Sequence, residues 1–95
     1  MYKVCIVTGA SRGLGRGIAK VLAEERSATV YATARSEAAL NDLASSIKDN
    51  TGVIHPVVLD QSDDSAVEKF ITTVAEKEGR IDLLVNSAYG GLTAM

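Results

Sequence analysis

Glycines near the start of the chain have the spacing of a phosphate-binding turn. Gly9, Gly13 and Gly15 follow an apolar run at residues 4–7 and open a helical pattern. The first glycine allows a tight turn out of a strand, the second lets the backbone approach a phosphate, and the third lets the helix pack on the strand. N–H groups at the start of that helix favour negative charge, so the pattern predicts a site for a dinucleotide pyrophosphate. The residues assigned to this turn are Thr8, Gly9, Ser11, Arg12, Gly13, Leu14 and Gly15.

The same turn also matches a second chemical pattern. Ser11 stands between two glycines as Gly-x-Ser-x-Gly, which in serine hydrolases places the nucleophile on a strand-to-helix turn. Such a triad needs an acid and then a histidine after the serine. The single histidine is His55, and no acid between it and Ser11 is well placed. A hydrolase with Ser11 as nucleophile is therefore a remote alternative. One cysteine and one histidine fall short of a metal ligand set, so no metal site is predicted.

Strand-like and helix-like segments alternate along the whole chain. The predicted strands cover residues 3–8, 29–33, 53–59 and 81–86, and the predicted helices cover residues 13–25, 36–49 and 62–79. Pro56 indicates that the third strand lies at an edge. The order β-α-β-α-β-α-β predicts an α/β fold, a partial doubly wound (Rossmann) sheet with parallel strands in the order 3-2-1-4. We expect residues 1–95 to form one incomplete domain of this type.

Each predicted helix has one apolar stripe that would face the sheet. These stripes are Leu14, Ile18, Val21 and Leu22, then Leu40, Leu43, Ala44 and Ile47, and then Val67, Phe70, Ile71 and Val74. Ser36 and Ser62 are expected to begin the second and third helices, and Gly79 is expected to end the third. The continuous apolar run at residues 83–85 predicts a fourth strand covered on both faces.

This strand order brings two distant motifs to one edge of the sheet. The carboxyl ends of the first and fourth strands are neighbours at the point where the winding reverses, which is where ligands bind in such sheets. Residues 8–15 follow the first strand and residues 86–91 follow the fourth. We therefore expect both segments to line one binding crevice.

The end of the second strand indicates which dinucleotide would bind. An NAD site needs a carboxylate there for the ribose 2′-hydroxyl, but the strand ends Ala32-Thr33-Ala34-Arg35 with no acid. Arg35, together with Arg12 in the glycine-rich turn, can grip a 2′-phosphate through charge-assisted hydrogen bonds. The sequence therefore favours NADP(H) over NAD(H).

Composition excludes several classes of partner. The 95 residues carry a net charge of −2, so neither nucleic acid nor an acidic membrane surface is expected as a partner. Residues 1–50 hold seven Lys/Arg against five Asp/Glu, and residues 51–95 hold three against seven, which leaves the expected phosphate side mildly basic. The single cysteine, Cys5, indicates a buried thiol and a reducing, intracellular and cytoplasmic location.

These motifs resemble one known family. Residues 8–15, Asp60 and residues 86–90 are similar, in order and spacing, to the amino-terminal half of a short-chain dehydrogenase/reductase, and the resemblance covers essentially all 95 residues. It implies that Asp60 hydrogen-bonds the adenine amino group, that Asn86 lines the nicotinamide side, and that Ala88 lies beside the cofactor. It also implies hydride transfer between the nicotinamide and a small carbonyl or alcohol substrate, and it allows an association with the endoplasmic reticulum.

The chain departs from that family at three positions. Ser87 and Tyr89 stand where the family has Asn and Gly after the fourth strand. Ser27 stands where a helix-ending Gly is common, and serine should weaken that helix end slightly.

The catalytic groups of the family are missing from this sequence. In the family a Ser orients the substrate carbonyl, a Tyr acts as general acid and base, and a Lys four residues later lowers the pKa of that Tyr. None of Tyr2, Tyr31 and Tyr89 is followed by Lys at that distance. We therefore assign no catalytic residue and predict that residues 1–95 alone are inactive.

Two accounts of the missing catalytic half stay open. The chain is either the cofactor-binding half of an oxidoreductase, or a non-catalytic truncated product that binds nucleotide or a full-length partner. The open edge of the fourth strand favours self-association, so we expect residues 1–95 to form a homo-oligomer or to be only marginally folded. The substrate is not encoded in these residues, because the catalytic half would form its pocket.

Overall fold

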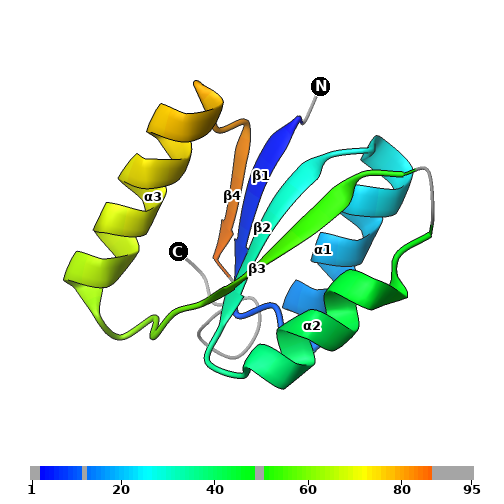
Figure 1. Ribbon diagram of the computed structural model, residues 1–95, viewed down its shortest axis with the longest axis horizontal. Helices are drawn as coiled ribbons and strands as arrows, with labels where there is room; N and C mark the ends of the chain where they lie inside the picture. Colours follow the sequence, from blue (N-terminus) through cyan, green and yellow to red (C-terminus); the bar gives the residue numbers. More distant parts are fainter. Residues whose placement is uncertain (1–2, 12, 49–50, 87–95) are drawn as a thin grey trace.

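Parallel strands pair in the order β3-β2-β1-β4 to form the sheet (Figure 1). The computed structural model describes residues 3–11, 13–48 and 51–86. The strands in this part of the chain are β1 (Val4–Thr8), β2 (Thr29–Ala34), β3 (Val53–Val58) and β4 (Leu83–Asn86). The predicted α/β fold and strand order are confirmed, and Pro56 lies in the edge strand β3, which pairs with β2.

The helices connect successive strands and lie on both faces of the sheet. They are α1 (Gly13–Arg26), α2 (Glu37–Ser46) and α3 (Asp64–Glu78). Figure 1 shows α1 and α2 on one face of the sheet and α3 on the other. Among the described residues, no helix has the length and apolar character needed to cross a membrane.

β1 is buried along its whole length because both faces of the sheet are covered there. Cys5 and Val7 pack in the cluster that contains the buried side chains of α1 and α2. Val4 and Ile6 point the other way, into the cluster beneath α3. Cys5 has no exposed surface, and burial raises the pKa of its thiol. These properties confirm the expected buried thiol.

The face of α1 that packs on the sheet differs from the predicted stripe. Leu14 and Val21, expected inside, are 44% and 53% exposed. The buried residues of this helix are Gly15, Ala19, Leu22 and Ala23. Small residues at every fourth position let the helix approach the sheet closely, and the larger side chains of Leu14 and Val21 then lie outside. The predicted stripe is therefore wrong for Leu14 and Val21, but it is confirmed for Leu22, which is buried in the core, and for Ile18, which packs against it.

β4 is covered on one face in the part of the chain that the structure describes. Leu83 and Val85 pack against the cluster beneath α1 and α2, but Leu84 is 49% exposed. The expectation of a strand covered on both faces is therefore wrong for these residues. The reason is the position of α3, whose buried Val74 packs in one cluster with Ile6 of β1 and with β2.

α2 begins as predicted and ends early. The hydroxyl of Ser36 accepts a hydrogen bond from the backbone N–H of Ala39 at 3.2 Å, which makes it the N-cap. The helix ends at Ser46 rather than at residue 49, because Ile47 adopts extended backbone angles while its side chain stays packed on the core.

The N-cap of α3 lies one residue later than the predicted cap, Ser62. Asp63 is the N-cap instead, and its carboxylate accepts a hydrogen bond from Ala66 N–H at 3.1 Å. Gly79 ends the helix as expected, with a φ of 77° and its N–H bonded to the Ala75 carbonyl oxygen at 2.9 Å.

The residue that follows the last residue of α1 has a left-handed conformation. Ser27 has a φ of 53°, and Ala28 N–H closes the helix by donating to the Leu22 carbonyl oxygen at 3.2 Å. The Ala23 carbonyl accepts instead from Gly52 N–H at 2.8 Å. Gly52 also lies so close to the backbone of Ala28 that a Cβ added at Gly52 would be 2.1 Å from the Ala28 carbonyl oxygen. The backbone at Ser27 confirms that this is the position where glycine would fit better.

One tyrosine connects the sheet to the end of α3. Tyr31 of β2 is 6% exposed, and its ring centroid lies 5.0 Å from that of His55 and 6.1 Å from that of Phe70. Its hydroxyl donates a hydrogen bond to the Glu78 carboxylate. Burial and then the contact with Glu78 raise the pKa of Tyr31 to about 12.

Candidate functional site

The carboxyl ends of β1 and β4 are joined by two residues assigned to the binding crevice. Thr8 lies opposite Asn86 in the parallel ladder, and its hydroxyl donates to Asn86 Oδ1 at 3.1 Å. Thr8 is 3% exposed, whereas Asn86 is exposed. The structure thus brings together the two predicted motifs at the point where each strand ends. The remainder of the second motif, Ala88 included, lies outside the described residues.

The turn after β1 requires two of its glycines for conformational reasons. Gly9 and Gly13 have φ values of 64° and 63°, which most side chains adopt only with strain. The turn is also fixed to the neighbouring strand, because Ala10 N–H donates to the Thr33 carbonyl oxygen at 3.0 Å. A Cβ added at Gly13 would meet no atom of the described residues within 4 Å. The backbone at Gly13 therefore faces open space that a ligand could enter.

The start of α1 is suited to an anion. The helix begins at Gly13, has no acidic residue in its first turn, and buries Gly15 against the sheet. The first N–H groups of a helix lack partners within the helix, and the helix dipole adds partial positive charge. Ser11 is half-buried in the turn and Leu14 is exposed beside it. Arg12, the remaining residue assigned to this turn, lies outside the described residues.

The carboxyl ends of β2 and β3 bring Arg35 and Asp60 into one region. Leu59 N–H donates to the Ala34 carbonyl oxygen at 3.0 Å. Arg35 directly follows Ala34, and Asp60 directly follows Leu59. Both side chains are exposed. Asp60 lies beyond the end of β3, in a turn where its Oδ1 accepts hydrogen bonds from Ser62 N–H at 2.9 Å and from Ser62 Oγ–H at 2.7 Å.

The charge state of Asp60 follows from that turn. The hydrogen bonds from Ser62 lower the pKa of the Asp60 carboxyl, and the charge of Arg35 lowers it further. Asp60 is therefore an ionised acceptor at neutral pH. A carboxylate of this kind can accept a hydrogen bond from an amino group such as that of adenine.

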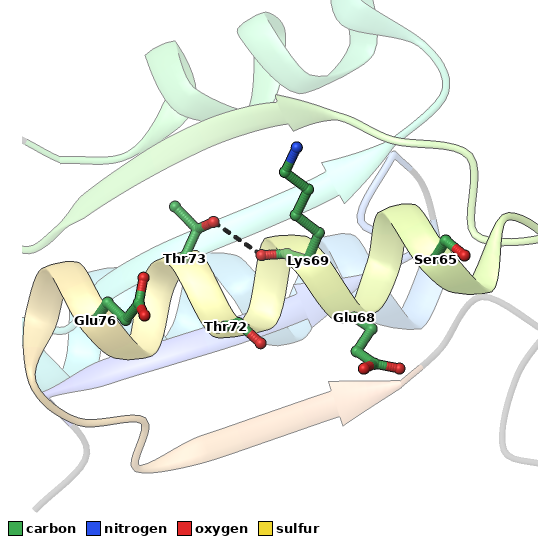
Figure 2. A pocket seen from close by; sticks show the side chains of 6 residues that line it. All are labelled: Ser65, Glu68, Lys69, Thr72, Thr73 and Glu76. Atoms are coloured by element: carbon green, nitrogen blue, oxygen red, sulfur yellow. Dashed lines mark hydrogen bonds between the residues drawn. The ribbon is translucent and has the colours of Figure 1, made fainter.

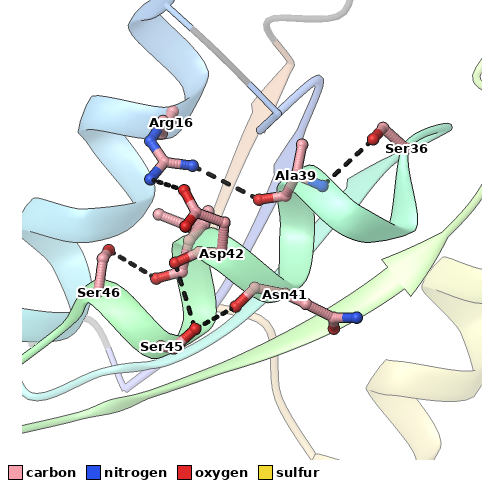
Figure 3. Close-up of polar contacts among 8 residues, drawn as sticks. Arg16, Ser36, Ala39, Asn41, Asp42, Ser45 and Ser46 are labelled. Carbon is pink, nitrogen blue, oxygen red and sulfur yellow. Dashed lines mark hydrogen bonds and ion pairs between the residues drawn. The ribbon is translucent and has the colours of Figure 1, made fainter.

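Arg16 connects two helices through contacts that were not predicted from the sequence. Its guanidinium Nη2 lies 2.9 Å from Asp42 Oδ2, and its Nη1 donates to the Ala39 carbonyl oxygen at 3.4 Å. Figure 3 shows the Arg16 side chain reaching from α1 to α2. Its partners lie 23 and 26 residues away, so no local motif indicates them.

Asp82 is a second missed residue, and its role is structural. Its Oδ2 accepts hydrogen bonds from the backbone N–H groups of Lys3 at 3.0 Å and Val4 at 2.9 Å. Its Oδ1 pairs with Arg80 at 2.6 Å. The pairing with Arg80 and the hydrogen bond from Val4 lower the pKa of Asp82 to about 2. Asp82 therefore joins the start of β1 to the segment that enters β4.

A hollow of about 410 Å³ lies elsewhere, on the exposed side of α3. It is lined by Ser65, Glu68, Lys69, Thr72, Thr73 and Glu76. Figure 2 shows Lys69 pointing to one side of the helix and Glu68 to the other, so the two charges do not converge. All the lining residues come from one helix and are exposed. We assign no binding role to this hollow.

The geometry gives the hydrolase alternative no support. His55 lies in the middle of β3, opposite Tyr31, and its ring contacts the Tyr31 ring in a tilted arrangement, with an angle of 34° between the ring planes. Ser11 lies beyond the end of β1, so the two residues are at different levels of the sheet. Among the described residues, no group of three or more His, Cys, Asp and Glu side chains could hold a metal ion.

Comparison with known proteins connects this site to one family. A sequence model described as short chain dehydrogenase matches residues 3–94. The chain is 46% identical over 94 residues to dehydrogenase/reductase SDR family member 1 of Mus musculus, covering 98% of this chain and 30% of that protein.

Solved structures have the same fold. A β-ketoacyl-[ACP] reductase of Bacteroides thetaiotaomicron has a TM-score of 0.84 at 31% identity, over 93% of this chain and 41% of that chain. A metagenomic short-chain oxidoreductase solved in complex with NADP has a TM-score of 0.78 at 36% identity, over 86% of this chain and 37% of that chain. The chain thus spans about a third of the length of the curated relative that it matches, and somewhat more of these two structures.

Proposed function

The chain belongs to the short-chain dehydrogenase/reductase family, and from this premise we propose that it binds NADP(H) along the carboxyl edge of its sheet. It would supply the cofactor-binding part of an enzyme that transfers hydride between the nicotinamide and a carbonyl or alcohol substrate. The observation that carries the proposal is the open, acid-free start of α1 at Gly13, beside the hydrogen bond that joins Thr8 to Asn86.

The residues along this edge fit successive parts of the cofactor. The turn at Gly9 and Gly13 would bind the pyrophosphate through its N–H groups. Arg35, after β2, would bind the 2′-phosphate, and Asp60, after β3, would accept a hydrogen bond from the adenine amino group. Asn86, at the end of β4, lies on the opposite side of the turn, where the nicotinamide would extend. The bound nicotinamide supplies the hydride donor or acceptor.

The preference for NADP(H) rests on the end of β2. The described residues there are Thr33, Ala34 and Arg35, and none carries the carboxylate that an NAD site uses for the ribose 2′-hydroxyl. The related oxidoreductase solved with NADP supports the same cofactor class. Arg35 is exposed, so a phosphate can reach it without displacing packed side chains.

Substitution of Gly13 tests the binding site. In the variant Gly13→Asn, asparagine tolerates a positive φ better than most residues do. The asparagine side chain would, however, enter the open space where we propose that the phosphate binds. We expect the affinity for both NADPH and NADH to fall by about tenfold or more, because hydrogen bonds to a charged group contribute about 1.5–3 kcal/mol. Titration of each cofactor, followed by nicotinamide fluorescence, measures the change in the purified gene product.

Gly17→Ala is the matched control. Gly17 lies one turn further along α1, and a Cβ added there also meets no atom within 4 Å in the part of the chain that the structure describes. Alanine favours the helix, so this variant should bind both cofactors like the wild type. Unchanged affinity in Gly13→Asn would contradict the proposed site, and so would a wild-type protein that binds neither cofactor.

A further inference from the structure

We propose that Arg16 is a positioning residue for the 2′-phosphate site. In this arrangement Arg16 holds the first turns of α2, and with them Arg35, against the start of α1. The inference rests on the proposed function, because it assumes that Arg35 binds the 2′-phosphate. It assigns Arg16 no direct contact with the cofactor.

The contacts of Arg16 lie at the cofactor end of both helices. Arg16 is in the first turn of α1, three residues after Gly13. Its guanidinium contacts the Ala39 carbonyl oxygen and the Asp42 carboxylate, which belong to the first two turns of α2 (Figure 3). The Arg16 side chain is 30% exposed and that of Asp42 is 76% exposed, so Arg16 is half-buried between the helices and its ion pair with Asp42 faces solvent.

A short series of bonds leads from Arg16 to Arg35. The Ala39 carbonyl oxygen accepts a hydrogen bond from Arg16. The N–H of the same residue, Ala39, donates to Ser36 Oγ at 3.2 Å. Leu40 N–H also donates to the Ser36 carbonyl oxygen at 3.1 Å. Ser36 is bonded directly to Arg35. A shift of the first turn of α2 would therefore move the backbone of Arg35 with it.

A second contact joins the same pair of helical segments at the far end. Lys48 N–H, after the end of α2, donates to Glu24 Oε2 of α1 at 3.0 Å. This contact also fixes α2 relative to α1, but it lies away from Arg35. Glu24 and Arg16 therefore form a matched pair: both connect the helices, and only Arg16 does so beside the proposed phosphate site.

Arg16→Ala, Asp42→Ala and Glu24→Ala separate positioning from the two other roles that Arg16 could have. If Arg16 positions Arg35, the first two variants reduce the fraction of molecules with Arg35 in place, and the apparent affinity falls by that fraction. If the Arg16 charge attracted the phosphates directly, Asp42→Ala would leave NADPH binding unchanged or make it tighter. If the contact only stabilised the helix pair, Glu24→Ala would have the same effect as Arg16→Ala.

The experiment measures dissociation constants for NADPH and NADH in the purified gene product and these three variants. We expect Arg16→Ala and Asp42→Ala to weaken NADPH binding by about three- to tenfold and NADH binding by less than about twofold. Glu24→Ala should leave both constants within about twofold of the wild type.

Three results would overturn the inference. They are an equal loss for both cofactors in Arg16→Ala, unchanged NADPH binding in Arg16→Ala or Asp42→Ala, and a selective loss of NADPH affinity in Glu24→Ala. If the wild type binds NADPH, any of these results in the variants leaves the proposed function intact. A wild type that binds neither cofactor overturns the proposed function itself, so the two failures are distinguishable.

Discussion

The hydroxyl of Thr8 donates a hydrogen bond to Asn86 Oδ1 across 78 residues of sequence. This bond joins the last residue of β1 to the last residue of β4, and the ladder pairs the same two residues. The glycine-rich turn therefore starts beside Asn86 at one edge of the sheet. A ligand placed over this point can contact both the turn and Asn86, which favours this edge over the hollow on α3 as the cofactor site.

Arg35→Ala should reduce the affinity for NADPH by about ten- to a hundredfold, because a charge-assisted hydrogen bond contributes about 1.5–3 kcal/mol. NADH has no 2′-phosphate, so its affinity should hardly change. Parallel titrations of both cofactors measure the difference, and general unfolding would weaken both alike. Equal losses, or no loss for NADPH, would show that Arg35 does not bind the 2′-phosphate.

Ser27→Gly should stabilise the protein by about 0.5–1 kcal/mol, because a left-handed φ costs an L-residue about 1–2 kcal/mol and glycine loses part of this gain through chain entropy. Urea unfolding measures the change. Lys20→Gly is the control, because Lys20 lies in the middle of α1, where glycine should destabilise by about 1 kcal/mol. The same sign of change in both variants would contradict this account of the end of α1.

The strand order followed from sequence because it depends on local signals. Apolar runs, helical periodicity and the glycine-rich turn each occupy a few consecutive residues, and the crossover rule then fixes the order. The ends of the elements were less predictable, since single side chains decide them. Asp63 rather than Ser62 caps α3, and Ile47 ends α2 by turning extended.

The positions of the assigned residues in the fold were predictable to a similar degree. Thr8 and Asn86 meet as expected because both end neighbouring strands. Arg16 and Asp82 were missed, because the partners of Arg16 and the backbone partners of Asp82 lie 23 or more residues away and belong to parts of the chain that meet only when it folds. The exposure of Leu14 was also missed, because small residues decide how α1 packs.

Asp82 should make the stability of the protein depend on acid pH. Its pKa is about 2 in the folded state, below the ordinary value of about 3.9 expected for the unfolded chain. A lowered pKa gives stability that is fully present above the unfolded value and lost as the pH falls toward the folded value. Asp82→Asn should therefore be less stable than the wild type at pH 7, with a difference that shrinks between about pH 4 and pH 2. Urea unfolding across this range measures it, and a constant difference would contradict the assignment.

Tyr31 should respond in the alkaline range, with the opposite sign. Its pKa is about 12 in the folded state against about 10 in an unfolded chain. The buried, hydrogen-bonded phenol therefore gives stability that is present below about pH 10 and lost as the pH rises toward 12. Tyr31→Phe keeps the ring beside His55 and Phe70 but removes the hydrogen bond to Glu78. We expect it to cost about 1–2 kcal/mol at pH 7, and its stability should fall less than that of the wild type above about pH 10.

Glu78→Gln separates the two effects at Tyr31. Glutamine keeps an acceptor for the tyrosine hydroxyl but removes the negative charge that raises the pKa of Tyr31. The pKa of Tyr31 should therefore fall in Glu78→Gln, although burial keeps it above the ordinary value. Phenolate absorbance measured against pH, with the Tyr31→Phe spectrum subtracted to isolate this residue, gives the comparison. A Tyr31 titration that is the same in Glu78→Gln and in the wild type would show that the Glu78 charge does not act on this hydroxyl, and that burial and the hydrogen bond set the shift.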